Sequence, residues 1–198
     1  LKDGPIKTIS DLKGKKVGFS VGGFEEALLS GMLQKYNLNM SDVDLVNINF
    51  SLSPSLIAKK VDAVIGAFRN FELNQMDIVN HPGRAFYPEE HGVPTYEELI
   101  YIANQKNKNN PLFDKFFSAI QKATLTIIND PVSTWKDFSS YRKGLDDELN
   151  KRAYKDTISR FALRPQAHDL KTYTNFSKFL EKKGIIKKIT KVETFAKP

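Results

Sequence analysis

The chain has 198 residues, 40% hydrophobic and 27% charged, a composition that excludes a disordered chain and is typical of globular proteins. It contains no cysteine, which excludes disulfides, thiol nucleophiles and Cys-ligated zinc, and no apolar run approaches the roughly 18 residues of a membrane span. The net charge of +7 makes nucleic acid a partner to consider, because clustered cations bind phosphates.

The positive charge gathers toward the C-terminus. Lysines there alternate with apolar residues, as on the solvated face of a helix, while the arginines are scattered and no RNP-like aromatic motif is present. We therefore expect no nucleic-acid partner. The lysines concerned are Lys171, Lys178, Lys182, Lys183, Lys187, Lys188 and Lys191.

The chain begins LKDGPIKT, without an initiator methionine, a basic segment or an apolar signal region. We interpret it as either processed or part of a longer protein. The missing signal therefore says nothing about export.

A glycine-rich turn joins the first strand to the first helix. Residues 16–20 predict a short strand, and apolar residues at helical spacing predict a helix over 24–36, whose first-turn acids suit the helix dipole. The turn reads GFSVGG, and GFSVG fits the G-x-S-x-G pattern of a nucleophile elbow. The turn also suits a binding site, because Gly22 and Gly23 let the backbone approach a ligand at a helix N-terminus.

Two further strands follow, each with its own helix. Residues 44–49 predict a strand, and 53–60 predict a helix capped by Ser53. The compact apolar run 61–68 is typical of a strand buried on both faces. Residues 69–80 predict the next helix.

The pattern changes in the second half. RAFYP (84–88) and EELIYIAN (97–104) predict two more strands, so residues 1–105 favour an α/β lobe with a mostly parallel sheet. Residues 106–198 predict a helical region without convincing strands. Its first helix has one continuous apolar face, Trp135 on the second is expected to pack within the region, and Gly184 is the expected C-cap of the last helix.

A serine hydrolase would use Ser20 as its nucleophile, with a histidine and a carboxylate. His168 lies downstream, but in a polar connection with no strand leading into it. Few residues precede the first strand, where a hydrolase has several strands and an oxyanion loop. We therefore favour a binding role for Ser20, Gly22 and Gly23 over a catalytic one.

Polar residues follow the third strand, at the position where parallel sheets contact their ligands. They read Arg69-Asn70-Phe71-Glu72, and Asn70 offers both a donor and an acceptor. Arg69 and Asn70 are therefore candidate ligand-binding residues. The same residues are equally a good helix start, with Asn70 as cap and Glu72 in the first turn.

The loop PEEHGVP (88–94) places Glu89 and Glu90 beside His91. The other histidines have no ligand-like spacing, so we expect no metal. A carboxylate in this loop can instead accept two parallel hydrogen bonds from a flat nitrogen heterocycle.

Four segments, ISDLKGKKVGFS, VDAVIGAFRNFELNQ, EEHGVPTYEELIYIAN and AIQKATLTIINDPVSTWKDF, resemble the thiamine pyrimidine-precursor family of substrate-binding proteins. That family groups periplasmic receptors of ABC importers with the fungal hydroxymethylpyrimidine phosphate synthases. The resemblance runs from Ile9 to Leu180, and DAVIGAFRNFE with EEHGVP carries it most specifically.

The resemblance implies a type II periplasmic-binding-protein fold, in which two α/β lobes close over a ligand. The chain would be the second lobe, and the helices of 106–198 would pack on a first lobe that is missing here. Their uncovered apolar faces would favour a homo-oligomer of the chain alone. The resemblance also implies a periplasmic, or exported and membrane-associated, protein that delivers its solute to the membrane subunits of an ABC importer.

For the ligand, the resemblance implies an aminopyrimidine bound in the interlobe cleft, without a cofactor. Asn70 matches the family's ligand-contacting Asn, and Glu90, or less closely Glu89, its pyrimidine-reading carboxylate. The synthases carry a cysteine-rich motif that this chain lacks, so we expect a binding protein rather than an enzyme. A pyrimidine synthase and a serine hydrolase remain the alternatives, and weaker candidates for ring stacking are Phe19, Phe24 and Tyr87.

Overall fold

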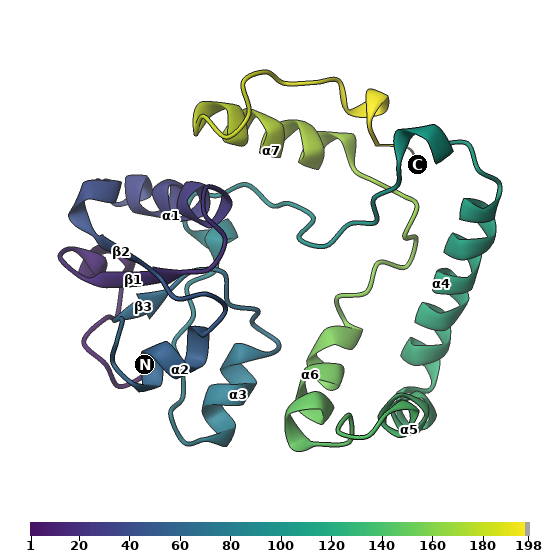
Figure 1. Ribbon diagram of the computed structural model, residues 1–198, viewed down its shortest axis with the longest axis horizontal. Helices are drawn as coiled ribbons and strands as arrows, with labels where there is room; N and C mark the ends of the chain where they lie inside the picture. The colour runs from purple at the N-terminus through teal and green to yellow at the C-terminus, as the bar shows by residue number, and fades with distance from the viewer. Residues whose placement is uncertain (197–198) are drawn as a thin grey trace. The chain divides into compact units, whose positions relative to one another are not determined.

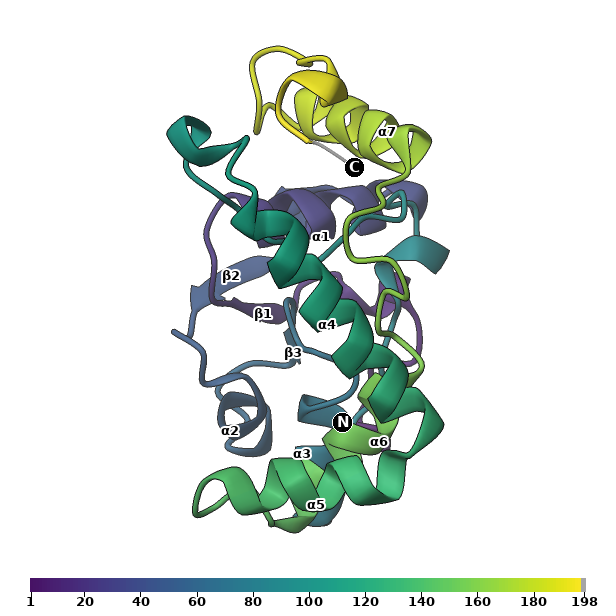
Figure 2. The ribbon, with the colours of Figure 1, turned by 90° about the vertical axis from the view of Figure 1, so that its right-hand side faces the viewer.

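The computed structural model describes residues 1–196, which divide into two compact units (Figures 1 and 2). The first unit comprises Leu1–Thr95 and Thr174–Thr190, and the second comprises Tyr96–Tyr173 with the C-terminal end. The sequence pattern predicts one boundary, after residue 105. Residues Thr174–Thr190 belong to the first unit because most of the last long helix, Leu170–Lys182, packs on it.

A parallel sheet of three strands lies at the centre of the first unit. Strands β1 (Lys16–Phe19), β2 (Asp44–Asn47) and β3 (Ala63–Val64) pair in the order β2–β1–β3, and Val17 in the middle strand is buried. The predicted parallel sheet is confirmed. β3 is shorter than the predicted 61–68 and only half-buried, because among residues 1–196 no strand pairs with its outer edge.

Helices cover both faces of this sheet. α1 (Phe24–Lys35) lies on one face, and α2 (Leu52–Ile57) and α3 (Glu72–Ile78) lie on the other (Figures 1 and 2). The chain therefore runs from β1 to β2 over one face and returns to β3 over the other. Since the helices after β1 and β3 leave on opposite faces, the carboxyl ends of these neighbouring strands form a topological switch point, where open α/β sheets bind ligands.

Helix α1 lies between the sheet and α7 (Leu170–Lys182). Phe176 of α7 meets Phe24 edge to face, with ring centroids 6.3 Å apart, and Phe179 lies against Gly31. α1 is therefore apolar around much of its circumference rather than along one narrow stripe. Its buried apolar residues are Ala27, Leu28, Leu29, Met32 and Leu33.

A lysine and a glycine hold the end of α7. The Lys183 ammonium donates hydrogen bonds to Ser30 Oγ at 3.0 Å and to Gln34 Oε1 at 2.8 Å, both on α1. Gly184 has φ +74°, and the N–H of the following residue donates to the Leu180 carbonyl at 2.9 Å. This is a Schellman ending, and it confirms Gly184 as the predicted C-cap.

Three local predictions are wrong. Neither RAFYP nor EELIYIAN is a strand in the described chain, and Leu99 and Ile102 are 82% and 88% exposed. Apolar and aromatic residues show which segments favour burial in a sheet, but a strand also needs a neighbouring strand as its hydrogen-bonding partner. Helix α2 starts at Leu52, so its N-cap is Ser51 and not Ser53.

The second unit is helical, as predicted. It contains α4 (Leu112–Asn129), α5 (Pro131–Tyr141) and α6 (Glu148–Ile158). The rings of Trp135 and Tyr154 lie 5.2 Å apart, so Trp135 packs within this unit as expected. Among residues 1–196, no helix combines the length and the apolar character that crossing a bilayer requires.

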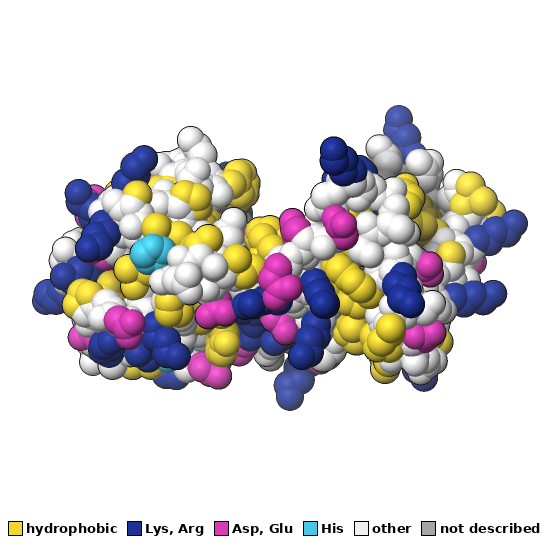
Figure 3. Space-filling model, turned by 90° about the horizontal axis from the view of Figure 1, so that it is seen from below, with side chains coloured by type: hydrophobic (Ala, Val, Ile, Leu, Met, Phe, Trp, Pro, Cys, Tyr) yellow, Lys and Arg dark blue, Asp and Glu magenta, His cyan; other side chains and the backbone are white. Residues whose placement is uncertain are grey.

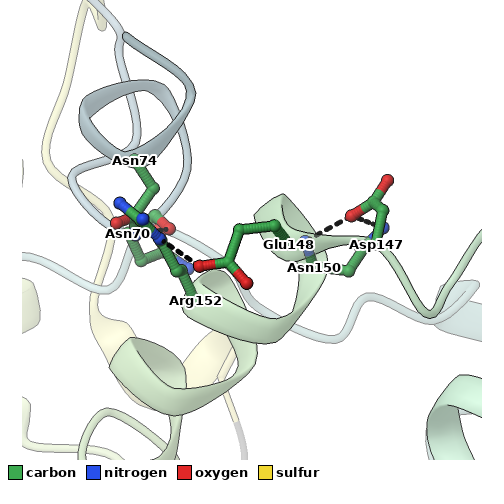
Figure 4. A network of polar contacts seen from close by, with 6 residues as sticks. All are labelled: Asn70, Asn74, Asp147, Glu148, Asn150 and Arg152. Atoms are coloured by element: carbon green, nitrogen blue, oxygen red, sulfur yellow. Dashed lines mark hydrogen bonds and ion pairs between the residues drawn. The ribbon is translucent and has the colours of Figure 1, made fainter. Parts of the chain in front are cut away.

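Polar contacts define the start of α6. The Asp147 carboxylate accepts a hydrogen bond from the backbone N–H of Asn150 at 2.7 Å, as an N-cap does (Figure 4). One turn on, Arg152 Nε and Glu148 Oε1 lie 2.7 Å apart. Pairs of this kind on an exposed helix add only about 0.3–0.5 kcal/mol, so the cap is the main local stabilisation.

The apolar face of α4 is largely uncovered within the second unit. Leu112 is 62% exposed and Phe116 is 44% exposed, although Phe116 also meets Tyr101 edge to face at 5.3 Å. Figure 3 shows hydrophobic side chains reaching the surface on the face that it displays. An exposed apolar face of this length is typical of a surface that contacts another partner.

Candidate ligand-binding site

The turn after β1 is held by a carboxylate of the same chain. The backbone N–H of Ser20 donates to Glu25 Oε2 at 2.7 Å. Gly23, the N-cap of α1, has φ +79°, a conformation that glycine adopts without strain. Ser20, Gly22 and Gly23 thus lie at the carboxyl end of β1, but the Ser20 amide is already engaged.

Within residues 1–196, the Ser20 hydroxyl contacts no base that could accept its proton. Its Oγ is buried and makes no hydrogen bond within residues 1–196. A serine nucleophile needs a base within hydrogen-bond reach to accept its proton. The geometry therefore gives no support to the serine hydrolase alternative.

An ion pair occupies the segment after β3. Arg69 donates from Nη1 and Nη2 to the two carboxylate oxygens of Glu89, at 2.9 and 3.1 Å, and its guanidinium lies 4.0 Å from the centroid of the Tyr87 ring. Hydrogen bonding to Glu89 raises the pKa of Arg69, against the opposing effect of burial. Arg69 and Glu89 therefore neutralise each other instead of presenting two separate charges.

Asn70 lies just before the first turn of α3. The Asn74 amide donates to the Asn70 carbonyl at 3.0 Å, and Figure 4 shows the two residues together. The Glu72 carboxylate accepts from the backbone N–H of Phe68 at 2.7 Å, and burial raises the pKa of Glu72. The N-cap is Phe71, so the predicted capping role of Asn70 is wrong. The Glu72 side chain instead binds the N–H of Phe68, in the turn before the helix.

The loop that carries Glu90 docks on the far half of α1. The Lys35 ammonium donates to the Glu90 carbonyl, and the Tyr36 hydroxyl lies 2.7 Å from His91 Nδ1. Lys35 ends a helix of 12 residues, about 18 Å long at a rise of 1.5 Å per residue. The structure thus holds the Glu90 backbone toward the opposite end of α1 from the glycine turn, with the Glu90 side chain exposed.

Exposed phenylalanines follow β2 and β3. Phe50 is 79% exposed, Phe68 44% and Phe71 37%. Rings at the carboxyl ends of strands can stack on a flat ligand, because aromatic faces attract one another at offset or edge-on contact. Phe24 and Tyr87, the weaker candidates for stacking, are engaged by α7 and by the ion pair.

The predicted site residues fall into two groups. The glycine turn and the segment that carries Arg69 and Asn70 lie at the carboxyl ends of β1 and β3. The Arg69–Glu89 ion pair ties the loop of Glu89 and Glu90 to this segment, while Lys35 holds the Glu90 backbone near the end of α1. The sequence pattern did not indicate a role for Glu25 or for the exposed Phe50, Phe68 and Phe71. Two adjacent acids in the first turn of α1 were the available signal, but helix-dipole stabilisation explains such acids equally well.

Comparison with known proteins identifies related sequences. The model of the family described as NMT1/THI5 like matches residues 1–134. A thiamine biosynthesis protein of Haemophilus influenzae is 45% identical over 197 residues, which are 99% of this chain and 63% of that protein. A formylaminopyrimidine-binding protein of Halalkalibacterium halodurans is 27% identical over 124 residues, which are 62% of this chain and 38% of that protein.

A fungal relative is named as an enzyme. The 4-amino-5-hydroxymethyl-2-methylpyrimidine phosphate synthase of Schizosaccharomyces pombe is 26% identical over 199 residues, which are 94% of this chain and 56% of the synthase. The chain therefore spans less than two thirds of the length of each of these relatives.

Two solved structures share the fold. The alkanesulfonate-binding protein SsuA of Xanthomonas axonopodis pv. citri, bound to MOPS, gives a TM-score of 0.67 at 16% identity over 96% of this chain and 65% of that protein. The periplasmic aliphatic sulphonate-binding protein SsuA of Escherichia coli gives 0.68 at 14% identity, over 100% of this chain and 63% of that protein. Likeness at these identities concerns the fold alone, and it confirms the predicted α/β fold of the periplasmic-binding-protein type.

Proposed function

We propose that this chain, which belongs to the NMT1/THI5-like family, is part of a solute-binding protein for a thiamine-precursor aminopyrimidine. The formylaminopyrimidine-binding relative and the thiamine biosynthesis relative support this ligand class. The ligand would bind at the carboxyl ends of β1 and β3, in a cleft that a further lobe of the complete protein closes. The apolar face of α4 would pack against that lobe, or against a second copy when the chain is alone.

The chemistry of the sheet edge carries this proposal. Exposed rings at Phe50, Phe68 and Phe71 suit a flat heterocycle, and the Arg69 guanidinium is neutralised by Glu89. An anionic solute such as a sulfonate needs cationic or N–H donors at its site. A ring that carries amine and ring N–H donors instead matches an amide oxygen such as that of Asn70 and a carboxylate such as that of Glu90.

Individual residues receive roles within this proposal. Asn70 would contact the pyrimidine through its amide, and Glu90 would accept hydrogen bonds from the ring nitrogen and the exocyclic amine. Ser20 and the glycines of the turn would line the same cleft. The Glu90 backbone is held on α1. A hydrogen bond from the ligand to Glu90 would therefore require the Glu90 side chain to extend to the cleft, or the loop to move on binding.

Partners and location extend the proposal. The solute would pass to the membrane subunits of an ABC importer, and the protein would be periplasmic or exported and membrane-associated, as in the periplasmic proteins that share its fold. No nucleic-acid partner is proposed. On the face displayed in Figure 3, lysine and arginine side chains are interspersed with acidic ones and do not form one continuous patch.

The second candidate function is pyrimidine synthesis, which the fungal relative favours. The chain has no cysteine, whereas the resemblance implies a cysteine-rich motif in the fungal synthases, in the region of GVPTYEELIY. We therefore propose a binding protein and no catalytic role. Release of a pyrimidine phosphate product by the purified protein would favour the synthase instead.

Calorimetry on the protein as expressed from its gene tests the ligand. We expect heat on titration with formylaminopyrimidine or hydroxymethylpyrimidine and none with an alkanesulfonate. The reverse pattern would overturn the ligand assignment. Glu90→Gln should weaken pyrimidine binding by at least about 1.5 kcal/mol, as loss of a charged hydrogen bond does. An unchanged affinity would remove Glu90 from the site.

A further inference from the structure

Glu25 is a buried acid that none of the proposed ligand contacts uses. It lies in the first turn of α1 and is 7% exposed. Acidic side chains are rarely buried to this extent unless a partner satisfies the carboxylate. The partner of Glu25 therefore indicates what the residue does.

Its carboxylate spans the switch point between β1 and β3. On the β1 side, Oε2 accepts the backbone N–H of Ser20 at 2.7 Å. On the β3 side, the carboxylate lies so close to Gly66 that a Cβ there would stand 2.2 Å from Oε1. Gly66 has φ +92°, so both its conformation and this close approach require glycine.

The last backbone hydrogen bond between these strands lies just before this contact. The N–H of Ile65 donates to the Gly18 carbonyl at 2.9 Å. After this bond, the segments that follow β1 and β3 separate toward their helices. Beyond that point, the Glu25 side chain bridges the two segments, through its hydrogen bond to Ser20 and its close contact with Gly66. Its negative charge also suits the N-terminal end of α1.

We propose that Glu25 is a positioning residue for the binding site. It fixes the Ser20–Gly23 turn against Gly66, and so sets the width of the crevice that the ligand enters. This role rests on the proposed function for its effect on affinity, but the contact itself exists in the free protein. Because a hydrogen bond to a carboxylate is charge-assisted, it holds the turn more firmly than a neutral one.

Nuclear magnetic resonance on the ligand-free chain tests the contact. We expect the Ser20 amide proton to resonate downfield and to exchange slowly with solvent, because it donates to a buried carboxylate. Glu25→Ala should move this resonance upfield and speed its exchange, and the neighbouring Glu26→Ala should change neither. A Ser20 amide that exchanges fast in the unaltered protein, or that is unchanged in Glu25→Ala, would overturn the proposal.

Affinity for formylaminopyrimidine tests the consequence. Glu25→Ala should weaken binding about tenfold or more, while Glu25→Gln, which still offers an acceptor oxygen, should stay within about threefold. Glu26→Gln should bind as the unaltered protein does. Full affinity in Glu25→Ala, or equal losses in Glu25→Ala and Glu25→Gln, would each count against positioning through this hydrogen bond.

Gly66 supplies a test that needs no ligand. Gly66→Ala should lower the melting temperature, and by less when Glu25→Ala has already removed the colliding carboxylate. The strain at φ +92° persists in both backgrounds and cancels in the comparison. Additive losses would refute the contact. If the unaltered protein binds no pyrimidine while the protected Ser20 amide and this coupling are observed, the proposed function fails and the positioning contact stands.

Discussion

Gly31→Ala tests the docking of α7 on α1, because the added Cβ favours the helix but collides with Phe179 of α7. Alanine in a helix is favoured over glycine by about 1 kcal/mol. A Cβ at Gly31, however, would stand 2.8 Å from Phe179 Cε2 and 3.2 Å from Val93 Cγ2. Carbon atoms in favourable contact are about 3.5–4.0 Å apart, so the ring must move.

The ring has little room to do so. Phe176 stacks on Phe179 with centroids 5.8 Å apart and planes at 14°, and the Lys183 ammonium lies 5.7 Å from its centroid. Overpacking of this kind typically costs about 1–3 kcal/mol. After the gain in helix propensity is subtracted, Gly31→Ala should destabilise the protein by about 0–2 kcal/mol.

Urea unfolding followed by circular dichroism measures the change, and Phe179→Leu provides the matched background. With the ring removed, the same Gly31→Ala substitution should become neutral or stabilising, so that the double-mutant cycle shows a coupling of about 1–3 kcal/mol. Each kcal/mol corresponds to about 2–4 °C in melting temperature for a chain of this size. The packing argument is refuted if Gly31→Ala stabilises the protein equally in both backgrounds.

Three further predictions concern single side chains. Gly184→Ala should cost about 1 kcal/mol in urea unfolding through backbone strain alone, since nothing lies within 4 Å of the added Cβ, and Gly184→Asn should cost less; equal costs would contradict this. Lys183→Met should lower the free energy of unfolding by about 1 kcal/mol, because it removes two hydrogen bonds. Burial lowers the pKa of Lys183, so the unaltered protein should gain stability through this group as pH rises toward about 10.4. The variant should show no such gain. Burial raises the pKa of Glu72 above its ordinary value of 4.5, so the folded state binds this proton more tightly than the unfolded state. The stability that this group contributes is therefore lost as pH rises above 4.5, and the unfolding midpoint of Glu72→Gln should lack this component of the pH dependence. A pH profile equal to that of the unaltered protein would count against it.

Local chemistry could be predicted from the sequence where short-range rules decide. The Gly22-Gly23 turn, the strand before it and the helix after it follow from glycine, alternation and helical spacing within a few residues. Gly184 as a C-cap follows in the same way. The resemblance then indicated the family, which the match over residues 1–134 confirms.

Pairings between distant segments could not be predicted in this way. EELIYIAN contains a run of apolar and aromatic residues that is typical of a strand, yet it is exposed and is not a strand within residues 1–196. In the sequence, Arg69 and Glu89 each suggested a charged group available to a ligand. Their bidentate contact pairs the two charges with each other instead. Nothing in the local pattern announces such a partner, because the partner lies 20 residues away in the chain.

The sequence by itself thus determined the α/β class, the glycine turn, the helical second half and the family. The tertiary structure alone decided that Glu25 reaches both Ser20 and Gly66, that Phe50, Phe68 and Phe71 stay exposed, and that Glu90 is held on α1. Propensity and periodicity act over neighbouring residues, whereas a buried carboxylate or an ion pair forms only where the strand order brings remote backbone together. The strand order β2–β1–β3 supplies that proximity at the edge where we place the ligand.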